Sequence, residues 1–285
     1  MLLPSPLRLS SLALATSLYF LTAPPTPAAD TVSDEQISAA LKTAGKNRTE
    51  IQRAIDDVTT DQRKGMRFLV AYMPERDLTS LTAKFLIEQT DYAYRAWRES
   101  PWTDQIPESV FFNDVLPYAS INERRDNWRA DFFKRFRPLV AKAKTPGEAA
   151  TQLNRAVFGR VKVRYSTGRP KADQSPYESI KAGLASCTGL SVLLIDACRA
   201  VGVPARFVGT PLWADGSGNH SWVEVYNEGG WHFTGAAEPT GNQLDRGWFL
   251  GRASKAQANH RKHAIYATSY KPTGQSFPMV WLPEA

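Results

Sequence analysis

The 285-residue sequence is poor in cysteine and histidine, with two of the first and four of the second. Two cysteines in a chain of this length exclude a disulfide-stabilised scaffold. There is no internal repeat, and 42% of the residues are hydrophobic while 22% are charged, which together exclude a disordered tail, a collagen-like chain and a polytopic membrane protein. Basic residues exceed acidic ones by only 35 to 28 and are scattered, so we expect no nucleic acid partner.

The first 29 residues have the three parts of a secretory signal. Arg8 is followed by an apolar run over residues 9–21 and then by small residues that end at Ala28 and Ala29. The run is shorter than the ~20 apolar residues that a membrane-spanning helix needs. The sequence therefore predicts a signal peptide over residues 1–29 and export to the periplasm or the extracellular space. The alternative is an uncleaved anchor, which would be the chain's only membrane attachment.

Helical periodicity dominates residues 30–150, which we predict to be a helical N-terminal region. Ser33 and Gln36 form a capping box, and Thr145 caps a helix that has proline at its first position. The first helical stretch is predicted over residues 33–71 and is interrupted at residues 45–47. Three further helices are predicted over residues 77–100, 121–136 and 145–158.

The apolar period changes from 3.6 to 2 after residue 158. Val161, Val163 and Tyr165 alternate with charged residues, which predicts the first strand. Helical and strand patterns are mixed from there to the C-terminus, so residues 151–285 are predicted to form an α+β domain.

The most informative helix is predicted to be capped by Ser186 or a neighbour, which places Cys187 in its first turn. Its apolar face continues to Val201, and Gly202 and Pro204 end it. The first turn of a helix carries a partial positive charge and unpaired N–H groups, which favour a thiolate over a thiol. On this evidence alone, a cysteine that merely packs in the core is an equal alternative for Cys187.

The two cysteines cannot form a disulfide with each other. Cys187 and Cys198 are eleven residues apart on one predicted helix, or roughly 16 Å at ~1.5 Å per residue. A disulfide needs Cα atoms within ~7 Å. Cys198 is therefore predicted to be a buried small residue, and Cys187 a free thiol.

A β-hairpin follows this helix. Residues 220–226 alternate strictly, 227–230 form a turn, and 231–234 return, which places His220 at the loop end of the first strand. A thiolate at a helix start and an imidazole at a strand start are what nucleophilic acyl chemistry needs, because the base removes the thiol proton and later protonates the leaving amine.

These segments resemble the core of the transglutaminase-like superfamily over roughly residues 155–240. The matching motifs are Gly183-x-x-x-Cys187-x-Gly189, Arg199-Ala-Val-Gly-Val-Pro-Ala-Arg206, His220-Ser-Trp-Val-Glu-Val-Tyr226 and Gly230-Trp-His232. The resemblance implies a papain-like fold in which a helix bearing the cysteine packs on an antiparallel sheet. It also implies a cysteine hydrolase or acyltransferase that acts on protein or peptide amide bonds as a peptidase, deamidase or transglutaminase. In that family Cys187 would be the nucleophile and His220 the base of a Cys-His-Asp triad.

The third member of the triad is where this sequence departs from the family. The usual position of the aspartate is occupied by Gly235, and Glu238 is the nearest acid. Regular pairing would point Glu238 away from His220, but a bulge within residues 234–237 would reverse this. Our hypothesis is that such a bulge brings Glu238 to His220. The alternative is that Glu238 is a solvated acid at a strand end.

Two other functions compete with an enzyme. The missing aspartate at 235 favours a non-catalytic transglutaminase-like module for binding or scaffolding, whereas Cys187 and His220 in their expected contexts argue against it. A third possibility, a protein that binds anionic surfaces, is supported only by the net charge of +7.

His260 and His263 lack a matching cysteine or acid pair, so we expect neither a metal nor a cofactor. Residues 245–248 are expected to form a loop over the site, and no oligomeric state is predicted.

Overall fold

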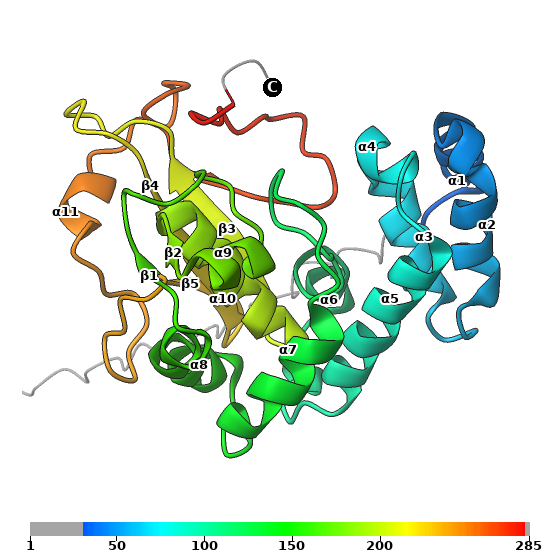
Figure 1. Cartoon of the computed structure of the whole chain (residues 1–285), viewed down its shortest axis with the longest axis horizontal. Helices are drawn as coiled ribbons and strands as arrows, with labels where there is room; N and C mark the ends of the chain where they lie inside the picture. Colours follow the sequence, from blue (N-terminus) through cyan, green and yellow to red (C-terminus); the bar gives the residue numbers. More distant parts are fainter. Residues whose placement is uncertain (1–30, 283–285) are drawn as a thin grey trace, which may run out of the picture.

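The computed structural model describes residues 31–282. The predicted signal peptide lies outside the described residues. Helices α1 to α5 gather on one side of the molecule, and α8 to α10 lie with the sheet on the other (Figure 1). In the described part of the chain, no helix is both long and apolar enough to cross a membrane.

The helices provide most of the regular structure, in both parts of the chain. In chain order they are α1 (Asp34–Thr43), α2 (Arg48–Asp57), α3 (Arg63–Tyr72), α4 (Glu75–Leu78), α5 (Ala83–Arg98), α6 (Glu108–Asp114), α7 (Arg129–Phe136), α8 (Pro146–Val161), α9 (Pro176–Ala182), α10 (Cys187–Ala200) and α11 (Leu250–Ala253), with 3-10 turns at Gly45–Asn47, Thr103–Gln105 and Arg137–Val140.

The main sheet is antiparallel, with strand order β5-β4-β3-β6. Its strands are β3 (Ala205–Thr210), β4 (His220–Asn227), β5 (Gly230–Thr234) and β6 (Tyr266–Ala267). The predicted hairpin is confirmed in its register, since Tyr226 pairs with Trp231. Glu228 and Gly229 both have positive φ, as a two-residue hairpin turn requires.

Helix α10 is the centre of the α+β part. Every residue from Thr188 to Ala200 is buried, and the helix contacts α7, α8, α9, β3 and β4. Apolar side chains of α10 and of β4, such as Leu190 and Val223, belong to one hydrophobic cluster. The predicted fold class is confirmed: a cysteine-bearing helix packs on an antiparallel sheet, behind a helical N-terminal region.

The predicted first residues of two helices are wrong. The helix expected from Asp77 begins at Ala83, because Thr82 caps α5 and the buried Asp77 carboxylate accepts hydrogen bonds from Tyr118 and Arg125 instead. The helix expected from residue 121 begins at Arg129.

The segment before α7 is irregular for a similar reason. The carboxylate of Glu123 accepts hydrogen bonds from the backbone N–H groups of Ser120 and Ile121, which holds residues 120–123 in a turn. These local side-chain-to-backbone hydrogen bonds replace the helical hydrogen bonds that the apolar pattern favoured.

The first predicted strand is also shorter than expected. Helix α8 continues to Val161, and Lys162 closes it in the left-handed conformation. Only β1 (Arg164–Tyr165) is extended, and it pairs in parallel with β2 (Leu184–Ala185). The predicted domain boundary between residues 150 and 151 lies inside helix α8, which is continuous from Pro146 to Val161. This boundary stays a prediction.

Candidate functional site

Cys187 is the first residue of α10, as predicted. Ser186 caps the helix by accepting a hydrogen bond from the N–H of Gly189, and its hydroxyl donates to the carbonyl of Ala172. The Cys187 side chain is partly exposed and forms no disulfide. Its position combines access to substrate with the positive end of a buried helix. Among the described residues, the N–H groups of Cys187 and Thr188 have no hydrogen-bond partner.

The second cysteine is structurally different. Cys198 is fully buried in the hydrophobic cluster around α10, and burial raises the pKa of its thiol well above the ordinary value. Buried cysteines of this kind are inert. The prediction of a small core residue is confirmed, and Cys187 is the accessible thiol of the two.

His220 is the first residue of β4 and is only 6% exposed. Its ring lies within 6.0 Å, centroid to centroid, of Trp213, Trp222, Trp248 and Phe249. This apolar enclosure penalises the charged form and lowers the pKa of His220 to about 4. The buried Nε2 atom has no hydrogen-bond partner among the described residues. His220 is therefore neutral at physiological pH and has a ring nitrogen free for proton transfer.

A buried hydrogen bond joins the two elements that carry Cys187 and His220. The hydroxyls of Thr188 and Ser221 are 3.1 Å apart, and each residue directly follows one of the candidate catalytic residues. The start of α10 thus lies against the start of β4. No hydrogen bond connects the thiol to the imidazole in the described structure, and catalytic hydrogen bonds of this kind often tighten only when substrate binds.

Glu238 is placed differently from our hypothesis. The β4–β5 pairing ends at Thr234, and a turn follows instead of a bulge: the N–H of Glu238 donates to the carbonyl of Gly235, and Ala237 has a positive φ. The Glu238 carboxylate accepts a hydrogen bond of 2.9 Å from Nε1 of Trp248. Within residues 31–282, no hydrogen bond joins it to His220. Partial burial raises the pKa of Glu238.

The turn after β5 is fixed by a residue that the sequence did not single out. Asn154 of α8 donates to the Thr234 hydroxyl and to the carbonyl of Gly235, and it accepts from the N–H of Ala237. No local pattern marks this asparagine, because its three partners lie about 80 residues away in the sequence. The structure therefore adds Asn154 to the residues that shape the site.

The expected loop over residues 245–248 does lie against the predicted base. Its Trp248 ring centroid is 4.9 Å from that of His220. The loop is tied to β5 by Asp245, whose carboxylate contacts Nδ1 of His232 at 2.6 Å and accepts from the N–H of Phe233. His232 thus helps to hold the loop of residues 245–248 against β5.

Residues 31–282 contain no cluster of three or more histidine, cysteine or acidic side chains suited to a metal ion. His260 and His263 stack on each other at 4.1 Å, and Nδ1 of His263 lies 3.1 Å from the carbonyl oxygen of Leu212. These two histidines therefore belong to a folded loop.

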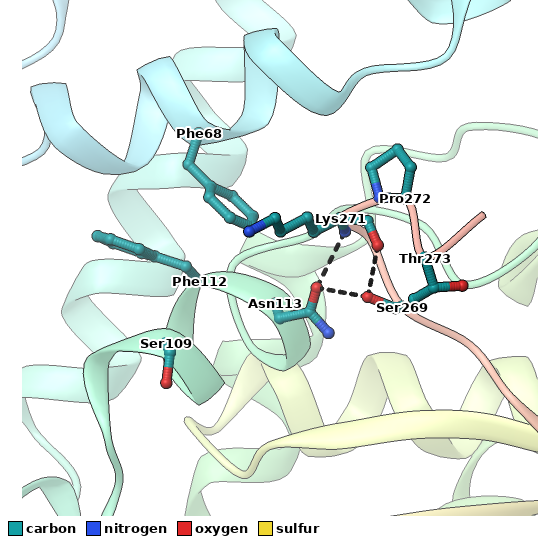
Figure 2. A pocket seen from close by; sticks show the side chains of 8 residues that line it. All are labelled: Phe68, Ser109, Phe112, Asn113, Ser269, Lys271, Pro272 and Thr273. Carbon is teal, nitrogen blue, oxygen red and sulfur yellow. Dashed lines mark hydrogen bonds between the residues drawn. The ribbon is translucent and has the colours of Figure 1, made fainter. Parts of the chain in front are cut away.

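The structure contains cavities at some distance along the chain from Cys187 and His220. One of about 350 Å³ lies between α3, α6 and the C-terminal segment. Figure 2 shows Lys271 extending into it toward Phe68, while Asn113 accepts hydrogen bonds from the Ser269 hydroxyl and the Lys271 N–H. Its side chains include neither of the candidate catalytic residues.

Another cavity is lined by α9 and by the loop that precedes it. It has a volume of about 420 Å³ and includes Lys171, Gln174 and Lys181 among its lining residues. Ala172, within the same loop, is the residue whose carbonyl accepts from Ser186. The loop that lines this cavity is thus joined by one hydrogen bond to Ser186, the residue that caps α10.

Residues 134–235 match the family model of the transglutaminase-like superfamily. A solved structure of a "putative cysteine protease" from Cytophaga hutchinsonii is similar with a TM-score of 0.34 and 20% sequence identity, over 50% of this chain and 48% of that chain. The chain thus matches about half the length of that protein. Curated proteins give no match. The matched segment contains both Cys187 and His220, so the similarity to the transglutaminase-like superfamily covers both candidate catalytic residues.

Proposed function

We propose that this protein is a transglutaminase-like cysteine enzyme that acts on amide bonds of proteins or peptides. The observation that carries the proposal is the Thr188–Ser221 hydrogen bond, because it holds the helix start with Cys187 against the strand start with His220. This neighbouring position of the two element starts supports Cys187 as the nucleophile and His220 as its base in acyl transfer.

The reaction begins with proton transfer from the Cys187 thiol to His220. A ring nitrogen is available for this proton, because His220 is neutral and its Nε2 atom is unpaired in the described structure. The thiolate attacks the amide carbonyl carbon and forms a tetrahedral intermediate. The imidazolium then protonates the departing nitrogen as the C–N bond breaks, which leaves a thioester on Cys187.

The first turn of α10 supports the oxyanion of that intermediate. The unpaired N–H groups of Cys187 and Thr188 point out of the helix start, where the helix dipole also favours negative charge. Water or an amine then releases the acyl group from the thioester. Water makes the protein a peptidase or deamidase, and an amine makes it a transglutaminase.

We propose Glu238 as the acidic residue that supports His220. Two observations favour it over a solvated acid: the carboxylate is partly buried, and its hydrogen-bond partner Trp248 lies against the imidazole.

We also propose that residues 1–29 direct export, so that Cys187 meets its substrate outside the cytoplasm. Within the described chain, Cys198 is the other cysteine and is buried in the core, so Cys187 has no disulfide partner there.

The test is an assay for an acyl-enzyme. The protein is incubated with a glutamine-containing peptide, with and without a fluorescent primary amine, and intact-mass spectrometry follows Cys187. We expect a covalent adduct on Cys187, followed by ammonia release, peptide cleavage or amine incorporation. Cys187→Ala should abolish all of these, and Cys198→Ala should leave them in place if it folds.

The competing function is a binding or scaffolding module, which the glycine at position 235 favours. Absence of any Cys187 adduct with peptides, together with a thiol no more reactive than free cysteine, would support that module and contradict an enzyme.

A further inference from the structure

The contact between Glu238 and Trp248 gives the acidic residue a different task from the one that a triad assigns. A triad acid hydrogen-bonds to the histidine and holds its ring. In this structure, the Glu238 carboxylate instead accepts from the indole N–H of Trp248 at 2.9 Å, and the Trp248 ring lies 4.9 Å from that of His220.

Trp248 is held in place although its side chain is exposed. It is 60% exposed, which is unusual for a tryptophan with a fixed position. The guanidinium of Arg252 lies 5.9 Å from the ring, and Arg252 is itself paired with Asp215 at 3.5 Å. Together with the hydrogen bond to Glu238, these contacts keep the ring over the imidazole.

We propose that Glu238 is a positioning residue that acts on His220 through Trp248, by fixing the indole against the imidazole. This inference rests on the proposed function, in which His220 is the base. The carboxylate orients the indole, and the indole in turn fixes the imidazole and keeps water from one of its faces.

Gly235 explains how the carboxylate reaches the indole. A Cβ atom at position 235 would collide with Oε2 and crowd the Cβ and carboxyl carbon of Glu238, so the missing side chain leaves the space into which Glu238 folds. Asn154 fixes the same turn through three hydrogen bonds. Glycine at the family's aspartate position is thus part of a different arrangement of the acid.

A direct and an indirect role for Glu238 predict opposite shifts of the His220 titration. The rings that surround His220 are uncharged, and burial is the cause of its lowered pKa. If Glu238 keeps the indole in place, then losing Glu238 admits water and raises the pKa of His220. If the carboxylate stabilised the imidazolium directly, losing it would lower that pKa.

The experiment measures the His220 titration by NMR on the whole protein with labelled histidine. His220→Gln identifies the signal among the four histidines. We expect Glu238→Ala and Trp248→Phe to raise the midpoint by about one pKa unit each, since both remove the anchoring hydrogen bond. Combining them should add little. Glu238→Gln keeps an acceptor oxygen for the indole and should leave the midpoint within a few tenths of a unit of the wild-type value.

Alkylation of Cys187 across pH gives a second readout that a merely structural role would not move. The pH at which the His220-dependent reaction begins should rise with Glu238→Ala and Trp248→Phe, and recover with Glu238→Gln. A lowered His220 midpoint in both Glu238 variants would overturn the proposal, as would unchanged midpoints in Glu238→Ala and Trp248→Phe. Because Trp248 is exposed, Trp248→Phe should fold even if Glu238→Ala does not.

The titration does not depend on turnover, which separates this inference from the proposed function. An inert Cys187 with the expected midpoint shifts would contradict the enzyme while leaving the contact between Glu238, Trp248 and His220 established. A reactive Cys187 with unchanged His220 midpoints would support the enzyme and contradict the positioning role of Glu238.

Discussion

Burial of His220 has a thermodynamic consequence that extends beyond catalysis. The pKa of this residue is lowered from 6.5 to about 4 because the folded protein excludes water from its ring. Between these two pH values the unfolded chain binds a proton that the folded protein does not. Folding stability therefore falls as the pH drops from 6.5 to 4.

We predict that His220 contributes up to about 3 kcal/mol to this loss of stability. Chemical denaturation at several pH values would measure it as a difference between the wild type and His220→Phe, in which the ring does not titrate. The variant should lose less stability over this pH range. Equal pH slopes for the two proteins would show that His220 is not buried as described.

Substitution of Gly235 tests the space that Glu238 occupies. The φ of Gly235 is not positive, so alanine fits the backbone there, but its Cβ would collide with the Glu238 carboxyl group. We expect Gly235→Ala to displace the carboxylate from Trp248 and to raise the pKa of His220, as Glu238→Ala does. Gly251 of α11 has open space at the Cβ position and provides the control, Gly251→Ala. An unchanged titration of His220 in Gly235→Ala would contradict this arrangement.

The individual residues of the site were predictable from the sequence to different degrees. Cys187 and His220 stand in local patterns, a capped helix start and an alternating hairpin, which report their positions without knowledge of the fold. The sequence singled out Glu238 as the candidate acid, but the geometry of its carboxylate depends on a turn fixed by Asn154. That contact joins residues about 80 positions apart, and no periodicity encodes it.

At the scale of elements, the junction between α10 and β4 determines the site. The Thr188 and Ser221 hydroxyls form a buried hydrogen bond across it. Thr188→Val removes one hydroxyl at nearly constant volume and leaves the Ser221 hydroxyl buried without its partner. We expect a loss of about 1–3 kcal/mol in the free energy of unfolding, together with slower alkylation of Cys187 at neutral pH.

A double-mutant cycle with Ser221→Ala is the control. Removing both hydroxyls leaves neither unpaired, so the double variant should lose less stability than the sum of the two single variants. Strictly additive losses would mean that the two hydroxyls do not interact.

The elements also show where sequence patterns failed. Capping signals at Ser33 and Thr145 predicted helix starts correctly, because a capping side chain acts within its own turn. The starts expected at Asp77 and residue 121 were wrong. There the Asp77 carboxylate accepts hydrogen bonds from the distant Tyr118 and Arg125. The Glu123 carboxylate accepts from nearby backbone N–H groups at residues 120 and 121, and both sets of hydrogen bonds outweigh local helix propensity.

At the scale of the whole molecule, two buried arginines connect the helical region to the α+β part. Arg129 of α7 is fully buried and donates to Gln89 of α5 and to carbonyls at residues 115–117 and at Arg199. Arg199 of α10 donates in turn to carbonyls of residues 114, 117, 119 and 205. Arginine suits this role because its guanidinium presents several donors in one plane.

We therefore predict that Arg129→Met destabilises the whole protein by at least about 3 kcal/mol, because the carbonyls lose their buried donor. Arg135→Met is the matched control on the same helix. Arg135 is partly exposed, pairs with Asp131 at 3.3 Å and lies 5.7 Å from the centre of the Phe136 ring, so its loss should change stability by less than about 1 kcal/mol.

Unfolding should remain a single transition when it is followed by tryptophan fluorescence and by far-UV circular dichroism. Two separate transitions in the wild type would contradict the view that the arginines join both parts into one folding unit. The sequence did not predict this connection, because a buried arginine in α7 looks like any charged residue of an amphipathic helix.

The central claim is that Cys187 is a nucleophile activated by His220. The most direct test is the rate of iodoacetamide alkylation of Cys187 between pH 4 and pH 10, measured by mass spectrometry in the wild type and in His220→Gln. We predict that wild-type Cys187 is alkylated faster than free cysteine between about pH 5 and pH 7. His220→Gln should lower the alkylation rate of Cys187 to that of free cysteine. The same pH dependence as free cysteine, in both proteins, would contradict it.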